Sequence, residues 1–298
     1  MYNSFLVDTL QSGELINGPG NCRIPDLPEP RFHHSLLLTA NGESVLNCGG
    51  SRGPGSRGDE KTCYKLDIHK KSWIYHSELN EEQFGATGIT MPNGVYLLGG
   101  IPPPMRNSSY STSEFLPKKN NGVWQTGPLI PNGLYKGCAV RISNEEIVLI
   151  GGWRTENRVM KFNINTNQFT PWNSLIQGRS EHSCVLLNDK ILVVGGKFRM
   201  DWLNSTEVIP LSTGTPRNGG NLNIARSSFG LATVGGQFQK VLAFGDYGPD
   251  GSSNYPVEEW KEDTETWTLT PFTLMEKKRS FGYLSVPQSI VCPNNKKM

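Results

Sequence analysis

The stretch Lys190-Ile-Leu-Val-Val-Gly-Gly196 decides the fold of this chain. It is a short apolar run, rich in β-branched residues, that stops at two glycines, which is typical of a buried strand and too short for a helix. The motif recurs as SVLNCGG ending at Gly50, GVYLLGG ending at Gly100, EIVLIGG ending at Gly152 and KVLAFGD ending at Asp246. Successive copies end 50, 52, 44 and 50 residues apart. A strand-rich repeat of about 40–50 residues predicts a β-propeller with one blade per repeat.

The composition fits one all-β domain and excludes several other classes. The 298 residues include 33 glycines and 20 prolines, a turn-rich composition that suits many short strands. The net charge is only +2, so the sequence offers no concentrated basic face to a nucleic acid. No apolar run approaches about 18 residues, so no membrane span is predicted.

Six cysteines and two glycosylation sequons favour an extracellular origin. The sequons begin at Asn107 and Asn204, in segments expected to be loops, where a glycan acceptor must lie. An even number of cysteines permits a disulfide framework without fixing its connectivity. We expect a secreted or extracellular protein whose signal peptide is absent from this sequence, because the first residues lack the basic and apolar regions of such a peptide. A cytoplasmic location is the alternative.

Other features recur in each repeat. A strand before the glycine motif often opens with arginine, as at Arg31, Arg179, Arg226 and Arg279. The third and fourth strands carry large apolar residues seven positions apart, at Leu66/Trp73, Phe162/Phe169 and Trp260/Trp267. A constant offset predicts a tight hairpin, since hairpin length sets the register.

These recurring residues have structural explanations. Glycines allow positive φ and a close approach of another backbone. Arginine at the head of the inner strand can donate to backbone carbonyls near the axis. Large flat aromatics on the fourth strand can fill the space between blades. The repeat therefore predicts the fold and says little about chemistry.

The order Arg-x-x-His, apolar strand with Gly-Gly, third strand and tryptophan resembles the Kelch repeat over nearly the whole chain. The resemblance implies a Kelch-type β-propeller with four-stranded antiparallel blades, lettered A to D from the axis outward. The second and third repeats lack the opening arginine, with Gln83 and Leu134 near that place, and the fourth lacks the tryptophan. We assign five blades to residues 31–79, 80–131, 132–176, 177–222 and 223–275.

The two ends of the chain are expected to share a sixth blade, so that residues 1–298 form one domain. Residues 276–298 would supply strands A and B, with QSIVC as strand B, and residues 1–30 would supply NSFLVDTL and CRIPDLP as strands C and D. Such closure pairs strand edges that would otherwise be open and ties down both termini.

The predicted blades suggest cysteine pairings. Cys22 and Cys292 would lie in the same closing blade, where a disulfide could latch the ring. Cys48 and Cys63 flank the first B–C loop on neighbouring strands and form the second candidate pair. Cys138 and Cys184 occupy matching places on the inner strands of the third and fourth blades, and we expect them to be free thiols.

A binding face is predicted where the B–C and D–A loops meet around the axis. Arginine and aromatic side chains are typical of interaction hot spots, and these loops carry several of both. The alternative is that the tryptophans fold back onto blade edges and the arginines are merely solvated. The candidate ligand-binding residues are Arg52, Arg106, Tyr110, Trp153, Arg154, Arg199, Trp202 and Tyr247.

The function predicted from these features is a non-catalytic, monomeric recognition module that binds a protein, peptide or glycan. The five histidines have no metal-ligand spacing and no nucleotide-binding motif occurs, so neither a metal nor another cofactor is expected. The alternative is a sugar-acting enzyme of the sialic-acid mutarotase kind, which the Kelch resemblance also allows. It would need arginines and a carboxylate at the axial opening, and Glu181 and Glu156 are the available carboxylates.

Overall fold

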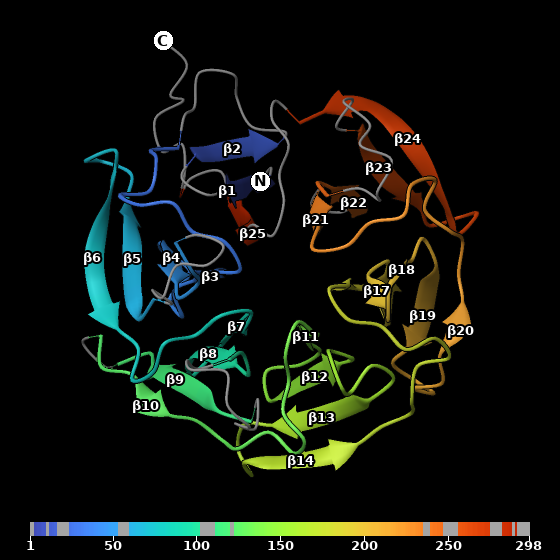
Figure 1. The fold of residues 1–298 in the computed structure, drawn as a ribbon, viewed down its shortest axis with the longest axis horizontal. Coiled ribbons are helices and arrows are strands. Elements are labelled where there is room, and N and C mark those ends of the chain that lie inside the picture. Colours follow the sequence, from blue (N-terminus) through green and yellow to red (C-terminus); the bar gives the residue numbers. More distant parts are fainter. Residues whose placement is uncertain are drawn as a thin grey trace.

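The chain forms a ring of β-sheets around a central axis, seen in a computed structural model (Figure 1). The structure describes residues 3–9, 12–16, 24–52, 60–101, 111–119, 122–234, 239–246, 256–274, 282–287 and 290. None of these residues belongs to a helix with the length and apolarity that a membrane crossing requires.

Five of the sheets are four-stranded antiparallel blades whose strands follow chain order from the axis outward. The first blade contains β3 (Ser35–Leu38), β4 (Val45–Cys48), β5 (Thr62–Asp67) and β6 (Ser72–Glu78). The second contains β7 (Thr87–Met91), β8 (Gly94–Leu98), β9 (Ser113–Pro117) and β10 (Gln125–Thr126). The third contains β11 (Cys138–Arg141), β12 (Glu146–Ile150), β13 (Val159–Asn163) and β14 (Gln168–Pro171).

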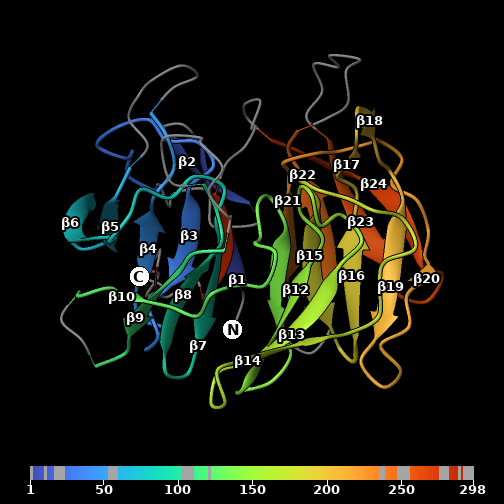
Figure 2. The ribbon, with the colours of Figure 1, turned by 60° about the horizontal axis from the view of Figure 1, so that its bottom comes forward.

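The fourth blade contains β15 (Ser183–Leu187), β16 (Lys190–Val194), β19 (Thr206–Pro210) and β20 (Arg217–Asn218). Between β16 and β19 the chain forms a separate hairpin of β17 (Lys197–Phe198) and β18 (Asp201–Trp202), which rises above the ring in Figure 2. The fifth blade contains β21 (Gly230–Val234), β22 (Lys240–Phe244), β23 (Pro256–Lys261) and β24 (Thr266–Thr273).

A three-stranded sheet lies between the fifth blade and the first. It consists of β25 (Gly282–Pro287), β1 (Asn3–Thr9) and β2 (Ser12–Ile16), and β25 contacts both β21 and β3. The two ends of the chain therefore meet in one sheet, as expected. The predicted division of its strands is wrong, because β1 pairs directly with β25, with Leu6 opposite Leu284. The N-terminal segment supplies the second and third strands, and Ile24–Leu27 of the predicted fourth strand is irregular.

The glycine doublets join each blade to the next. The N–H of Gly50, Gly100, Gly152 and Gly196 donates to a carbonyl of the following blade, at Gln83, Leu134, Arg179 and Arg226, over 2.7–3.0 Å. The glycine before each of them has positive φ and lies so close to the same carbonyl that a Cβ would stand 1.8–2.8 Å from its oxygen. Only glycine fits both requirements.

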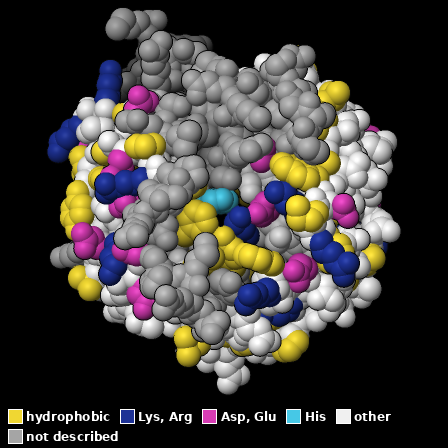
Figure 3. Space-filling view, viewed as in Figure 1, with side chains coloured by type: hydrophobic (Ala, Val, Ile, Leu, Met, Phe, Trp, Pro, Cys, Tyr) yellow, Lys and Arg dark blue, Asp and Glu magenta, His cyan; other side chains and the backbone are white. Residues whose placement is uncertain are grey.

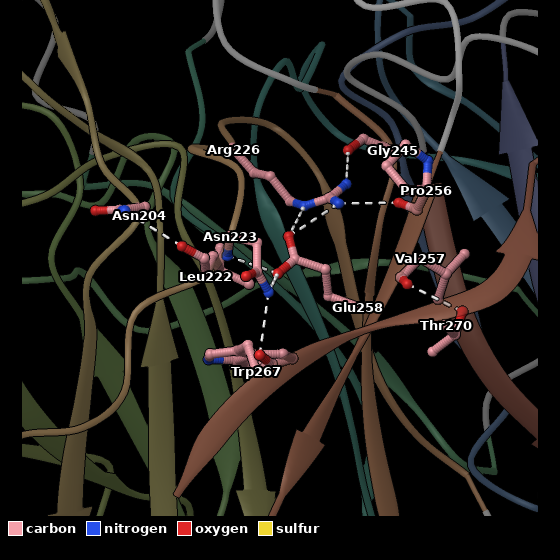
Figure 4. Close-up of polar contacts among 10 residues, drawn as sticks. All are labelled: Asn204, Leu222, Asn223, Arg226, Gly245, Pro256, Val257, Glu258, Trp267 and Thr270. Carbon is pink, nitrogen blue, oxygen red and sulfur yellow. Dashed lines mark hydrogen bonds and ion pairs between the residues drawn. The ribbon is translucent and has the colours of Figure 1, made fainter.

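Buried arginines hold the glycine end of strand B against strand C. Arg226 donates to the carbonyls of Gly245 and Pro256 and pairs with the Glu258 carboxylate at 3.1 Å (Figure 4). Arg179 pairs with Glu207 at 2.8 Å in the same way. The predicted bonds from arginine to backbone carbonyls are confirmed. The carboxylate partner adds charge compensation, without which a fully buried guanidinium would be costly.

Tryptophans fill the space between blades, as predicted. Trp73, Phe169 and Trp267 lie directly opposite Leu66, Phe162 and Trp260, so the seven-residue offset is a paired position of the hairpin. Trp267 is buried and its indole N–H donates to the Thr206 hydroxyl of the preceding blade at 2.9 Å. Trp124 donates likewise to Ser77 at 3.0 Å. Each of these indole rings therefore makes a hydrogen bond to the preceding blade in addition to its apolar packing.

The structure contains two described disulfides. Cys48–Cys63 joins paired residues of β4 and β5, and that prediction is confirmed. The prediction that Cys138 and Cys184 are free thiols is wrong, because they form a disulfide between β11 and β15 with a Cα–Cα distance of 6.0 Å. They do not occupy matching places: Cys138 lies four residues after Leu134, and Cys184 lies five after Arg179. That one-residue offset lets the two side chains meet across the blade boundary. Cys22 and Cys292 lie outside the described residues.

We predict that Gly99→Ala lowers the free energy of unfolding by about 3 kcal/mol or more, because its Cβ would collide with the Leu134 carbonyl. Gly42→Ala is the matched control, since Gly42 has nearly the same φ (+70° against +72°) with nothing within 4 Å of its Cβ position. Its cost should be about 1–2 kcal/mol. Denaturant unfolding of both variants measures the difference, and equal losses would contradict the close-approach explanation.

Candidate functional site

Five residues at equivalent places in five blades form a run around the mouth of the axis. Each lies two positions after the head of its inner strand and has positive φ, between 52° and 68°. Their backbones are joined in series by four N–H···O=C bonds of 2.7–3.3 Å, in which each residue after the first donates to its counterpart in the preceding blade. The backbone is therefore fixed while the side chain differs from blade to blade. The residues are His33, Gly85, Lys136, Glu181 and Ser228.

Two charged residues of this run, Lys136 and Glu181, form a cluster with Lys197 at the mouth of the axis. The Glu181 carboxylate pairs with Lys136 at 2.5 Å and with Lys197 of the β17–β18 hairpin at 3.2 Å. It also accepts the Ser227 hydroxyl at 2.6 Å. Two ammonium groups thus face one carboxylate, so the cluster carries one excess positive charge.

The electrostatics of the cluster follow from its contacts. Burial alone would raise the pKa of Glu181, but Lys136, the Ser227 hydroxyl and Lys197 together lower it to about 2. Burial, reinforced by Lys136, lowers the pKa of His33 to about 4. At neutral pH the carboxylate is therefore ionised and the imidazole is uncharged.

Aromatic side chains line the mouth on the side of the first three blades. Phe84 lies 6.4 Å from both Phe32 and Tyr135 between ring centroids, and 4.6 Å from His33. Trp153 follows at 5.8 Å from Tyr135 and is 50% exposed. Figure 3 shows hydrophobic, basic, acidic and histidine side chains gathered near the middle of this face.

Cation–aromatic pairs stand on the third and fourth blades next to this arc. The Arg154 guanidinium lies 5.9 Å from the Trp153 ring centroid, and Arg199 lies 5.3 Å from Phe198. In the hairpin, Lys197 lies over Trp202 at 4.4 Å. Distances below about 6 Å are those of cation–π contacts, which hold flexible cations in place at an exposed surface.

The mouth opens into an axial cavity of about 340 Å³ between the inner strands. Its wall includes the five residues of the backbone run described above. It also includes small residues of β7, β11 and β15 together with the Cys138–Cys184 disulfide. The Tyr283 hydroxyl reaches across to the Ser183 hydroxyl at 3.2 Å. Within the described part of the chain, no group of three or more His, Cys, Asp or Glu side chains is placed to hold a metal ion.

The predicted face residues have different settings. Trp153 and Arg154 lie on the third blade and Arg199 and Trp202 on the adjacent fourth blade, with Trp202 half-buried beneath Lys197. Arg52 instead forms ion pairs with Glu29 at 2.8 Å and with Glu60 at 2.5 Å, so its guanidinium is engaged in contacts at the first blade. Arg106, Tyr110, Tyr247 and the sequon residue Asn107 lie outside the described residues. Asn204 is exposed, and its side-chain amide donates to the Leu222 carbonyl.

Sequence reasoning missed the residues closest to the axis. Phe32, Phe84 and Tyr135 follow the head of the inner strand in three blades, and Lys136 lies one position further on. Aligning the repeats on that head position, rather than searching the long loops, would have found them. Glu181 was considered only as a carboxylate for the enzyme alternative.

Comparison with known proteins supports a Kelch-type propeller. No protein-family model matches the chain. An immune evasion protein of vaccinia virus (strain Copenhagen) is 24% identical over 177 residues, covering 46% of this chain and 35% of that protein. A Kelch repeat and BTB domain-containing protein of Caenorhabditis elegans is 24% identical over 143 residues, covering 43% of this chain and 25% of that protein. The aligned parts thus span about a third and a quarter of these relatives.

We predict a pH-dependent contribution of Glu181 to stability. Because its pKa is lower in the folded chain than its ordinary value of 4.5, its ion pairs stabilise the fold above pH 4.5 and this is lost as the pH falls toward 2. The shift corresponds to about 3 kcal/mol. The unfolding free energies of wild type and Glu181→Gln should differ most at pH 7 and converge only as the pH falls to about 2. Glu43→Gln, on an exposed hairpin, is the control, and a difference for Glu181→Gln that stays constant with pH would contradict the prediction.

Proposed function

We propose that this chain is a non-catalytic recognition module that binds a macromolecular ligand across the mouth of the axis. The observation that carries the proposal is the pair of cation–aromatic contacts, Trp153 with Arg154 and Phe198 with Arg199, on adjacent blades beside the aromatic arc. Exposed aromatic and arginine side chains held in fixed positions are typical of interface hot spots. Met200, 89% exposed at the tip of the hairpin, extends the same apolar surface.

A protein or peptide is the favoured ligand, with a glycan as the other candidate. The similarity to a Kelch repeat and BTB domain-containing protein supports an interaction role for the propeller. The excess positive charge at the mouth suits a partner that presents acidic or polar groups between apolar side chains. We propose that the chain acts as a monomer.

The enzyme alternative has less support. A general acid or base works best when its pKa lies near the operating pH. The pKa of Glu181 is held at about 2, and lysines rather than arginines flank it. Glu156 accepts the backbone N–H of Arg154 in an exposed turn. These settings favour structural and recognition roles for both carboxylates.

We count the sheet of β25, β1 and β2 as a sixth blade that closes the ring. Its inner strand β25 contacts the inner strands on both sides, and the Gly282 N–H donates to His34 of the first blade at 3.2 Å. We also propose an extracellular setting, which the two disulfides weakly favour, with Asn107 and Asn204 as glycan acceptors.

The binding test uses the glycosylated protein against panels of secreted proteins and glycans, followed by titration of any hit. Arg154→Ala and Arg199→Ala should each weaken binding by about 10-fold or more, which corresponds to about 1.4 kcal/mol. Tyr75→Ala is the control, because Tyr75 is an exposed aromatic (61%) on the outer strand β6, away from the proposed surface. Unchanged affinity for both arginine variants, or an equal loss with Tyr75→Ala, would refute this surface.

A further inference from the structure

The two disulfides differ in their access to solvent. Cys48 and Cys63 are 1% and 0% exposed and lie on paired strands within one blade. Cys138 and Cys184 instead form part of the wall of the axial cavity, and Cys184 is partly exposed, whereas Cys138 is only 7% exposed. A small molecule that enters the cavity therefore meets one sulfur of this bridge more readily than the other.

A histidine lies beside the less accessible sulfur. The His182 Nε2 atom is 3.2 Å from the Cys138 Sγ. Its Nδ1 atom has no hydrogen-bond partner among the described residues, so the ring proton is best placed on Nε2, which faces the sulfur. The imidazole also has a hydrogen bond to the backbone of Ile150, which the new thiolate would share. Burial and the nearby Arg179 lower the pKa of His182 to about 3, although the hydrogen bond to the Ile150 backbone acts to raise it, so the imidazole is neutral.

The mouth of the cavity favours anions. Lys136 and Lys197 face the single carboxylate of Glu181, and Lys136 and Glu181 belong to the cavity wall. The excess positive charge would attract a thiolate, and more strongly one that also carries carboxylates.

We propose that the axial cavity is a site of thiol–disulfide exchange, in which a low-molecular-weight anionic thiol attacks Cys184 and releases Cys138 beside His182. The incoming thiolate forms a bond to the Cys184 Sγ while the Cys138–Cys184 bond breaks. The electron pair of that bond goes to the Cys138 Sγ, where the His182 N–H donates to the new thiolate. A second thiol attacks the sulfur of the bound one, which yields an external disulfide and two protein thiols, so two thiols supply two electrons and two protons.

Other contacts besides this bridge join the same two blades. The third and fourth blades are also joined by the bonds from Gly152 N–H to the Arg179 carbonyl at 3.0 Å and from Glu181 N–H to the Lys136 carbonyl at 2.7 Å. Opening the disulfide removes a cross-link next to the charged cluster without removing these contacts. We therefore expect the exchange to take place in the folded protein.

The test exposes the native, full-length protein to reduced glutathione, followed by rapid alkylation and peptide mass spectrometry. Cys138–Cys184 should open about 10-fold or more faster than Cys48–Cys63, and the transient glutathione adduct should lie on Cys184. The buried bridge is the internal control within each sample. Equal rates for the two bridges, or an adduct on Cys138, would overturn the proposal.

A second measurement tests the role of the cations. In the double variant Lys136→Gln with Lys197→Gln, opening by glutathione should slow by about 3- to 10-fold, while opening by uncharged 2-mercaptoethanol should be unchanged. The ratio of the two rates cancels a general change in stability. If both thiols slow equally, or neither does, the cations do not guide the thiol and that part of the proposal is refuted.

Discussion

The backbone hydrogen bond from each second glycine to the next blade is the contact on which the ring depends. It requires two successive residues with positive φ, and the first must also come within van der Waals contact of the same carbonyl. Four of these junctions are equivalent, at Gly50, Gly100, Gly152 and Gly196. The buried arginines act on the same place, because Arg31, Arg179 and Arg226 each donate to the carbonyl of the glycine position in their own blade. Strand B is thereby fixed to its own strand C and to the neighbouring blade at once.

This backbone connection explains how the mouth can carry varied chemistry. The series of bonds through His33, Gly85, Lys136, Glu181 and Ser228 uses main-chain atoms alone. The side chains of these five residues can therefore differ without breaking the backbone bonds. Gly85 has no side chain, whereas Lys136 and Glu181 form an ion pair. The hairpin β17–β18 adds Lys197 to the same cluster from outside the blade. The residues proposed for recognition are thus held on a rigid backbone frame, as in many folds whose function lies in attached loops.

The sequence predicted the features that repeat and failed at those that do not. Strand B, its glycines, the inner arginines and the aromatic hairpin offset all recur, so their physical reasons could be inferred from one copy and checked in the others. The closing sheet has no repeated copy to compare with, so Ile24–Leu27 was mistaken for part of a strand while β2 was overlooked. The Cys138–Cys184 bridge depends on a one-residue offset between strands of different blades, which spacing along the chain does not reveal. The carboxylates Glu207 and Glu258 were missed because their value lies in neutralising an arginine that is distant in sequence.

Native-state hydrogen exchange at the four junction glycines tests the central claim most directly. If these bonds hold the ring, the amides of Gly50, Gly100, Gly152 and Gly196 exchange only through global unfolding, with the same free energy as buried amides of β16 such as that of Val193. If the glycine amides exchange through openings that leave the β16 amides protected, the junctions can break while the blades remain folded. That result would show that side-chain packing, and not the backbone contact, holds the ring together.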